Sequence, residues 1–188
     1  STLINEGVNV LCFNQRSIDE ILNVIEFIGR IVNLQEKTDR YLKGINSNLD
    51  CIRLSSKSLK KNPKVFFEEW DDPIITGIKW VSELIEIAGG IDIFKYYSSK
   101  PNAKDRIIKN SDEVINANPD IIFASWCGKK LNKDKIINRN NWHMINAVKN
   151  NDIYEVKSPL ILQPGPAALT DGLNEIKNVI SNWNMQQK

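Results

Sequence analysis

Histidine and cysteine are scarce, and their placement excludes several kinds of metal site. The 188 residues include one histidine, His143, and three cysteines, Cys12, Cys51 and Cys127. The cysteines lie far apart and form no C-x-x-C pair, so a disulfide framework or a structural zinc site is not expected. A site built from several histidines is excluded within this chain. We therefore expect no metal ligands in this chain.

Long apolar runs and an excess of charge of one sign are also missing. No stretch approaches the ~20 apolar residues that a membrane-spanning helix needs. Lys and Arg number 25 against 23 Asp and Glu, which leaves a net charge of only +2. The basic residues are scattered, which argues against nucleic acid as a partner. No signal peptide is visible. Residues 3–10 resemble the end of a helix that runs into a strand, so we expect further sequence upstream of Ser1.

The first third of the chain predicts one β-α unit followed by a long helix. Residues 8–13 are typical of a short strand, and Ser17 with Glu20 fits a capping box that begins a helix reaching residue 32. Apolar residues then recur at helical spacing over 34–60, interrupted only by Gly44. A helix of this length between two α/β units indicates a backbone that links two lobes.

The remaining residues alternate between strand and helix patterns. Strands are predicted at 64–68 and 121–124, a hairpin-like pair at 147–148 and 153–156, and helices at 76–88, 111–117, 134–139 and 166–183. Such alternation is typical of an α/β fold with a doubly wound, mostly parallel sheet. The expected architecture is one such lobe joined by the long helix to a partial second α/β lobe.

Three segments that follow predicted strands are the candidates for binding. In α/β sheets, ligands meet the loops beyond the carboxyl ends of the strands. Here these loops are 68–72, 125–130 and 157–166, and we expect them to form one wall of a cleft. The predicted ligand-binding residues are Glu69, Trp70, Asp71, Trp126, Cys127, Gly128, Gln163 and Gly165.

The residue types in these loops suit a large, flat ligand, although structural roles remain open. Trp70 and Trp126 can offer aromatic faces, or each can plug the top of the sheet. The acids at 68–72 can bind ligand amides, dock on a partner, or favour the N-terminus of the next helix. Gln163 and Gly165 can bind polar edges of a ligand or simply form a rigid turn. Cys127 with His143 as a base would be the alternative of a cytoplasmic enzyme or regulatory module, but no recognisable catalytic spacing supports it.

Several short motifs resemble one family. Segment 80–94, which ends in Gly89-Gly90 and Phe94, resembles the helix and turn of the helical-backbone substrate-binding proteins of ABC importers. Segment 111–122 and the stretch from 147 to Pro166 resemble that family's second and third signatures. Within the family, residues 67–73 are most similar to the cobalamin-binding (vitamin B12-binding) branch.

The resemblance implies two α/β lobes joined by one long helix, with the ligand between them. Residues 1–33 would then be the last β-α unit of the first lobe, 34–61 the inter-lobe helix and 62–188 the C-terminal lobe. It also implies a non-enzymatic corrinoid binder with no catalytic residues and no required cofactor. An ABC permease as a possible partner and a periplasmic or extracytoplasmic location are further implications. A ferric-siderophore or haem binder on the same scaffold is the alternative.

A chain with a partial first lobe has an unpaired sheet edge and a bare apolar face. Such surfaces favour pairing with another copy. We therefore expect a possible homodimer.

Overall fold

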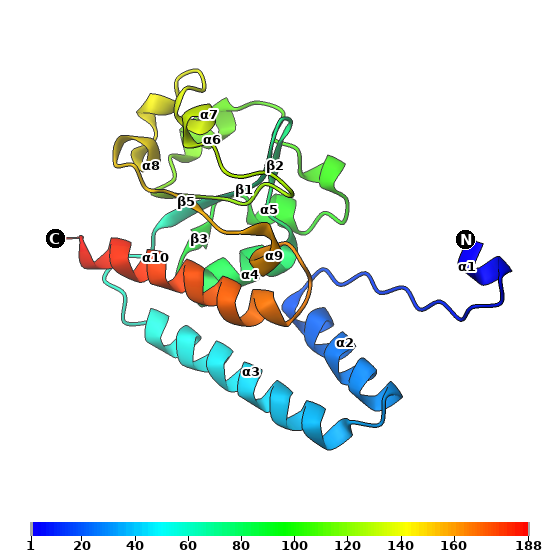
Figure 1. Ribbon diagram of the computed structural model, residues 1–188. Coiled ribbons are helices and arrows are strands. Elements are labelled where there is room, and N and C mark those ends of the chain that lie inside the picture. Colours follow the sequence, from blue (N-terminus) through cyan, green and yellow to red (C-terminus); the bar gives the residue numbers. More distant parts are fainter. Residues whose placement is uncertain (1, 188) are drawn as a thin grey trace.

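The computed structural model describes residues 2–187 as an α/β lobe with two helices along one side and an extended N-terminal tail (Figure 1). Four strands, β1 (Lys64–Asp71), β3 (Ile91–Asp92), β4 (Ile121–Ala124) and β5 (Ile153–Glu155), are parallel. One strand, β2 (Ile74–Thr76), is antiparallel to β1. The order is β2-β1-β4-β5, and β3 pairs with the beginning of β1. The prediction of a mostly parallel α/β sheet is confirmed.

Helices cover both faces of the sheet because the central strands are apolar on both sides. On one face, Val65 and Phe67 of β1 share a core with α2 (Ile18–Ile31), α3 (Gln35–Ser56), α4 (Lys79–Ile87) and α10 (Leu173–Met185). On the other face, Phe66 packs in a second core with Trp142 and Phe94. Figure 1 shows α3 and α10 below the sheet and α6 to α8 above it.

Short elements complete the chain. They are α1 (Thr2–Asn5), α5 (Lys95–Ser98), the 3-10 helix η1 (Ala103–Arg106), α6 (Asp112–Ala117), α7 (Lys133–Ile137), the 3-10 helix η2 (Trp142–Met144), α8 (Asn146–Lys149), α9 (Ser158–Ile161) and the π-helical turn η3 (Ala168–Gly172).

Helix α2 begins where the sequence predicts it. The Ser17 hydroxyl accepts from the amide of Glu20, and the Glu20 carboxylate accepts from the amide of Ser17, which completes the capping box. The amide of Ile18 donates to Glu83 of α4 at 2.8 Å, and the amide of Trp80 donates to the Arg16 carbonyl at 2.9 Å. These bonds attach the start of α2 to α4.

The long predicted helix is present as α3, which ends at Ser56 instead of residue 60. Ile45, Leu49 and Ile52 belong to the same core as strands β1 and β4. Helix α3 therefore packs on the lobe, and its N-terminal part lies beside α2 (Figure 1).

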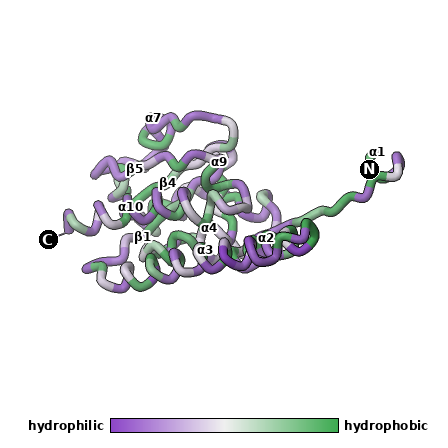
Figure 2. Tube along the Cα trace, turned by 60° about the horizontal axis from the view of Figure 1, so that its bottom comes forward, coloured by the Kyte–Doolittle hydropathy of each residue, from purple (hydrophilic) through white to green (hydrophobic). Residues whose placement is uncertain are grey.

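The predicted strand at 8–13 is wrong. These residues are extended and exposed, and Figure 2 shows them as a partly hydrophobic tail that projects from the remainder of the molecule. A strand needs a neighbour to bond its backbone N–H and C=O groups. Within residues 2–187, no segment pairs with this one.

Two further predictions about strands are corrected. Strand β1 continues to Asp71 because β2 folds back beside it and supplies the partner, with Asp71 opposite Ile74. The expected hairpin at 147–156 is absent, since Ala147 lies on α8 and β5 pairs in parallel with β4. The carbonyl of Pro119 accepts from the amide of Ala147 at 3.0 Å, which fixes the start of α8.

The helix predicted from residue 166 is interrupted. The π-helical turn η3 precedes α10, and Gly172 lies against the backbone of α9. A Cβ at Gly172 would lie 2.5 Å from the carbonyl oxygen of Leu160. The absent side chain therefore permits the close approach of the two segments.

Candidate functional site

The carboxyl edge of the sheet holds a buried network around Glu68. This side chain is fully buried at the point where β1 passes β4. Its Oε1 accepts from Nε1 of Trp126 at 3.0 Å and from Nη2 of Arg139 at 3.0 Å, while Arg139 Nη1 bonds its Oε2. Glu68 thus joins β1 to the loop after β4 and to the residues after α7.

The environment of Glu68 opposes its charge. Burial raises the pKa of this carboxyl above its ordinary value, although the hydrogen bonds and charge of Arg139 act against the rise. The guanidinium lies 4.4 Å from the centre of the Trp142 ring, which anchors its position. Glu68 was predicted at the boundary between a strand and a loop, and the structure places it inside strand β1.

A second carboxylate on this edge, Asp71, binds two lysines. Lys129 Nζ lies 2.7 Å from Oδ1 and Lys135 Nζ lies 3.2 Å from Oδ2. Burial acts to raise the pKa of Asp71, but the hydrogen bonds from Lys129 and Lys135 outweigh it and the pKa is lowered. The carboxylate therefore stays ionised and holds the 129–135 loop against β1.

The two predicted tryptophans lie on this edge beneath lysine side chains. Lys129 Nζ is 3.8 Å from the ring centre of Trp70 and 6.0 Å from that of Trp126, and Lys135 Nζ is 5.9 Å from Trp126. Trp126 is only 3% exposed, whereas Trp70 is half-buried. In this arrangement Trp70 is the aromatic residue that a ligand can reach.

Glu69 points away from this network. It forms an ion pair with the buried guanidinium of Arg106, with Nη1 2.6 Å from Oε2 and Nη2 3.1 Å from Oε1. Arg106 also bonds the carbonyl of Thr76, so the pair fastens the β1–β2 hairpin to η1. This arrangement gives Glu69 a structural partner.

The remaining predicted residues divide between two places. Cys127 and Gly128 are exposed on the loop after β4, and Gly128 has a left-handed φ of 71°. Gln163 and Gly165 follow α9, which Trp80 holds by donating to the Ile161 carbonyl at 2.8 Å. Within residues 2–187, no hydrogen bond or ion pair joins Gln163 or Gly165 to the Glu68–Asp71 network.

A small hollow connects the loops after β4 and β5. It is lined by Gly128, Lys129, Glu155 and residues 157–159, and its volume is about 240 Å³. Glu155 Oε1 accepts from the amide of Leu131 at 3.1 Å, which ties the two loops together. The hollow is open to solvent.

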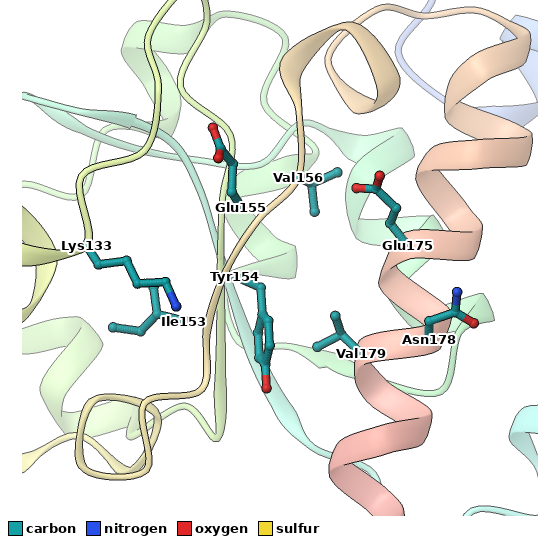
Figure 3. Close-up of a pocket in the computed structure, with 8 residues that line it drawn as sticks. All are labelled: Lys133, Ile153, Tyr154, Glu155, Val156, Glu175, Asn178 and Val179. Carbon is teal, nitrogen blue, oxygen red and sulfur yellow. The ribbon is translucent and has the colours of Figure 1, made fainter.

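Another hollow lies between β5 and α10, and it contains none of the predicted residues (Figure 3). Its lining includes Tyr154, whose hydroxyl donates to Asp152 at 3.0 Å. Burial and this carboxylate raise the pKa of Tyr154 to about 12. The hollow is lined by the aromatic ring of Tyr154, the aliphatic side chain of Val179 and the charged side chain of Lys133. This mixture of apolar and charged groups indicates no particular ligand.

Within the described residues, the structure holds no cluster of three or more side chains suited to a metal ion. The helices found there are also too short or too polar to cross a membrane.

The sequence interpretation missed the cations of this edge. Lys129, Lys135 and Arg139 follow β4 in a stretch with further lysines at 130 and 133. A charge count of this loop beside that of 68–72 would have indicated that the two loops neutralise one another.

Comparison with known proteins identifies the family. The profile of the family described as periplasmic binding protein matches residues 1–160. The substrate-binding lipoprotein YvrC of Bacillus subtilis, described as an uncharacterized ABC transporter component, is 29% identical over 187 residues, covering 95% of this chain and 55% of that protein. The high-affinity heme uptake system protein IsdE of Staphylococcus aureus is 29% identical over 129 residues, covering 61% of this chain and 42% of that protein. The chain thus spans about half the length of these relatives.

Solved structures share the fold. An ABC transporter substrate-binding protein from Listeria monocytogenes superimposes with a TM-score of 0.81 at 19% identity, covering 96% of this chain and 71% of that one. Staphylococcus aureus IsdE complexed with heme gives 0.78 at 20% identity, covering 95% and 70%. The vitamin B12 binding protein BtuF of Vibrio cholerae gives 0.70 at 21% identity, covering 99% and 69%.

The family match covers most of the chain and agrees with the helix-flanked parallel sheet. This chain belongs to the periplasmic binding protein family.

Proposed function

We propose that this chain is part of a non-catalytic substrate-binding protein that delivers a small molecule to an ABC permease outside the cytoplasm. The family match and the ABC transporter relatives support this proposal. In it, residues 1–33 are the end of one lobe, 34–61 form the connecting backbone and 62–188 form the C-terminal lobe. Helices α2 and α3 would then be the part of the protein that is packed firmly on the C-terminal lobe. The observation that carries it is the network at the carboxyl edge, where Glu68, Asp71 and Trp126 join the loops after β1 and β4.

The first candidate ligand is a corrinoid of the cobalamin type, bound in an inter-lobe cleft. Trp70 is half-buried and lies beside the hydrogen-bonding groups of this edge, which suits a large ring system with polar substituents. The fold likeness to a vitamin B12 binding protein agrees with this candidate. Glu69, Asp71, Trp126, Cys127, Gly128, Gln163 and Gly165 are the other residues proposed to form the site, with Trp126 buried beneath its surface.

Haem is the second candidate, with a ferric siderophore as a variant on the same scaffold. The sequence similarity to IsdE, described as a heme uptake protein, favours it. Lys129 and Lys135, which bind Asp71 at the candidate edge, also suit a ligand with anionic groups.

Visible absorption tests the proposal directly. The chain is titrated with cyanocobalamin, haemin and a ferric hydroxamate siderophore in separate experiments, and Trp70→Ala serves as the paired variant. A saturable spectral change with cyanocobalamin that weakens in Trp70→Ala supports the corrinoid. If only haemin or only the siderophore gives a saturable spectral change, that compound is the ligand. If none of the three compounds gives a spectral change, the proposed function is overturned.

A further inference from the structure

One group of lysines stands apart from the scattered basic residues of the chain. The segment that joins α3 to β1 carries Lys57, Lys60, Lys61 and Lys64, which are all exposed, and no carboxylate lies among residues 57–64. Within residues 2–187, none of these four lysines forms an ion pair. We propose that this basic loop, residues 57–64, and the helix ends beside it form a docking surface for a bilayer with anionic headgroups. Such docking goes beyond the proposed ligand binding, because the basic loop lies at the opposite edge of the sheet.

The positive charge of this surface persists when the neighbouring charges are counted. The last turns of α3 add the ion pair of Arg53 with Asp50, whose atoms lie 2.5 Å apart. The segments that lead into β4 and β5 add Asp120, Asp152 and Lys149. Six cations thus meet three carboxylates, which leaves a charge of +3: Arg53, Lys57, Lys60, Lys61, Lys64 and Lys149 against Asp50, Asp120 and Asp152.

The other acids near the loop have partners of their own. Asp152 is only 8% exposed and accepts from the hydroxyl of Tyr154 at 3.0 Å. Oδ2 of Asp120 accepts from the backbone amide of Lys64 at 2.9 Å. Glu86 of α4 is paired with Lys95 at 2.6 Å. The ammonium groups of the basic loop are therefore free to meet an anionic surface.

Contacts with α10 hold the basic loop in place. The amide of Lys60 donates to Oδ1 of Asn184 at 3.2 Å, and Nδ2 of Asn184 donates to the carbonyl of Lys61 at 2.7 Å. Lys61 Nζ also lies 5.5 Å from the centre of the Trp183 ring. Because the backbone is already ordered, docking loses less conformational entropy than it would with a flexible segment.

Two exposed apolar side chains flank the basic loop and favour a bilayer over a soluble polyanion. Leu54 near the end of α3 is 63% exposed, and Met185 at the end of α10 is 72% exposed. Figure 1 shows the ends of these two helices on the same side of the molecule, with the basic loop leading from one of them into the sheet. Apolar side chains that enter the headgroup region, next to lysines that attract anionic lipids, are typical of proteins that bind at a membrane surface.

Docking on this surface would also orient the lobe. Strands β1, β4 and β5 are parallel, and β1 runs from Lys64 at the basic loop to Asp71 at the candidate ligand edge. A bilayer against the basic loop therefore lies at the end of the sheet opposite the candidate site. The docked lobe would present that site to the surrounding solution, where the ligand is captured.

Sedimentation with sucrose-loaded vesicles tests this inference. The chain is mixed at low ionic strength with vesicles of phosphatidylcholine alone, or with vesicles in which about a third of the lipid is phosphatidylglycerol. The test variant is Lys57→Gln with Lys60→Gln, and Leu54→Gln tests the apolar contact. The control is Lys104→Gln with Lys109→Gln, which removes the same charge from a hollow beside η1.

We expect the unaltered chain to sediment with the anionic vesicles only, and added sodium chloride to release it. The Lys57/Lys60 variant should bind roughly tenfold more weakly and Leu54→Gln about threefold more weakly, while the control stays within about twofold of the unaltered chain. Equal binding to both kinds of vesicle, no binding to either, or equal loss in the control overturns the docking surface. Unchanged binding by Leu54→Gln overturns the bilayer and assigns the loop to a soluble polyanion. No ligand is present in this experiment, so its failure leaves the proposed function standing.

Discussion

At the scale of single residues, the ion pairs of the carboxyl edge differ in how deeply they are buried. Glu68 is enclosed with its arginine, whereas the lysines on Asp71 reach solvent. Removal of one partner of an ion pair lowers stability most where the other partner stays buried with its charge unpaired. The two carboxylates therefore predict different responses to substitution and to pH.

Replacement of Glu68 by alanine should destabilise the fold by about 3 kcal/mol, because Arg139 and the Trp126 indole lose a buried partner. Chemical denaturation at neutral pH measures this loss. Asp72→Ala is the control, since Asp72 is exposed beside the same strand, and its effect should stay within about 0.5 kcal/mol. Equal effects of the two changes would contradict the structural role of Glu68.

Asp71→Asn should lower the free energy of unfolding by about 1 kcal/mol at neutral pH. The ion pairs of Asp71 with Lys129 and Lys135 reach solvent, so they stabilise the fold less than buried ion pairs would. The pKa of Asp71 is lowered in the folded state, so its contribution is present above the unfolded pKa of about 3.9 and is lost as pH falls through the folded value. Denaturation curves between pH 7 and pH 2 should show the two proteins converging at the acidic end. A difference that persists unchanged at pH 2 would exclude the carboxylate as its source.

At the scale of elements, two glycines on helices predict opposite effects of the same substitution. A Cβ at Gly172 would meet the Leu160 carbonyl at 2.5 Å, whereas one at Gly44 in α3 would meet nothing within 4 Å. Gly172→Ala should therefore destabilise by about 1–3 kcal/mol, and Gly44→Ala should stabilise by about 1 kcal/mol. Thermal unfolding of both variants checks this, and a stabilising Gly172→Ala would contradict the close contact of η3 with α9.

The elements also show how far the sequence could predict the fold. Helix α2 and strand β4 follow from signals within their own residues, namely the capping box and a fully apolar run. The extension of β1 to Asp71 depends on β2, and the parallel pairing of β5 depends on β4, so neither can be read from a local pattern. The failed strand at 8–13 has the same cause, since strand formation requires a partner.

The candidate site was predictable to a similar degree. The rule that loops beyond the strand ends gather at one edge placed Trp70, Asp71 and Trp126 together, and the ion pairs agree. Loop residues 129 to 139 were missed because their partners lie about 60 to 70 positions earlier in the chain. Gln163 and Gly165 were assigned by the same rule, and they follow the short helix α9, so their role in the site stays a prediction.

At the scale of the whole molecule, the α2–α3 pair exposes an apolar surface. Six side chains on and between these helices are 43–56% exposed: Phe27, Ile28, Ile31, Val32, Leu34 and Tyr41. Several of them border a groove that reaches Pro166. Contiguous apolar patches of this kind favour association.

We expect the chain to self-associate through this surface at high micromolar concentration. Ile28→Lys should shift the light-scattering mass toward the monomer, because it places a charge within the patch at a residue that lines the groove. Leu54→Lys is the matched control, since Leu54 is 63% exposed on α3 but is not among the residues that line the groove. A monomeric unaltered chain, or equal effects of both changes, would contradict the prediction.

The shared core of α2, α3 and the sheet has a mechanical consequence. Ile21 of α2, Leu49 of α3 and Phe67 of β1 belong to one packed cluster, so the helical pair and the lobe must move as one stiff body. The N-terminal tail is different, since among the described residues no hydrogen bond involves residues 9–12 and their side chains are exposed. Residues 9–12 are therefore held less firmly than the residues that follow, which begin with the Phe13–Phe27 contact.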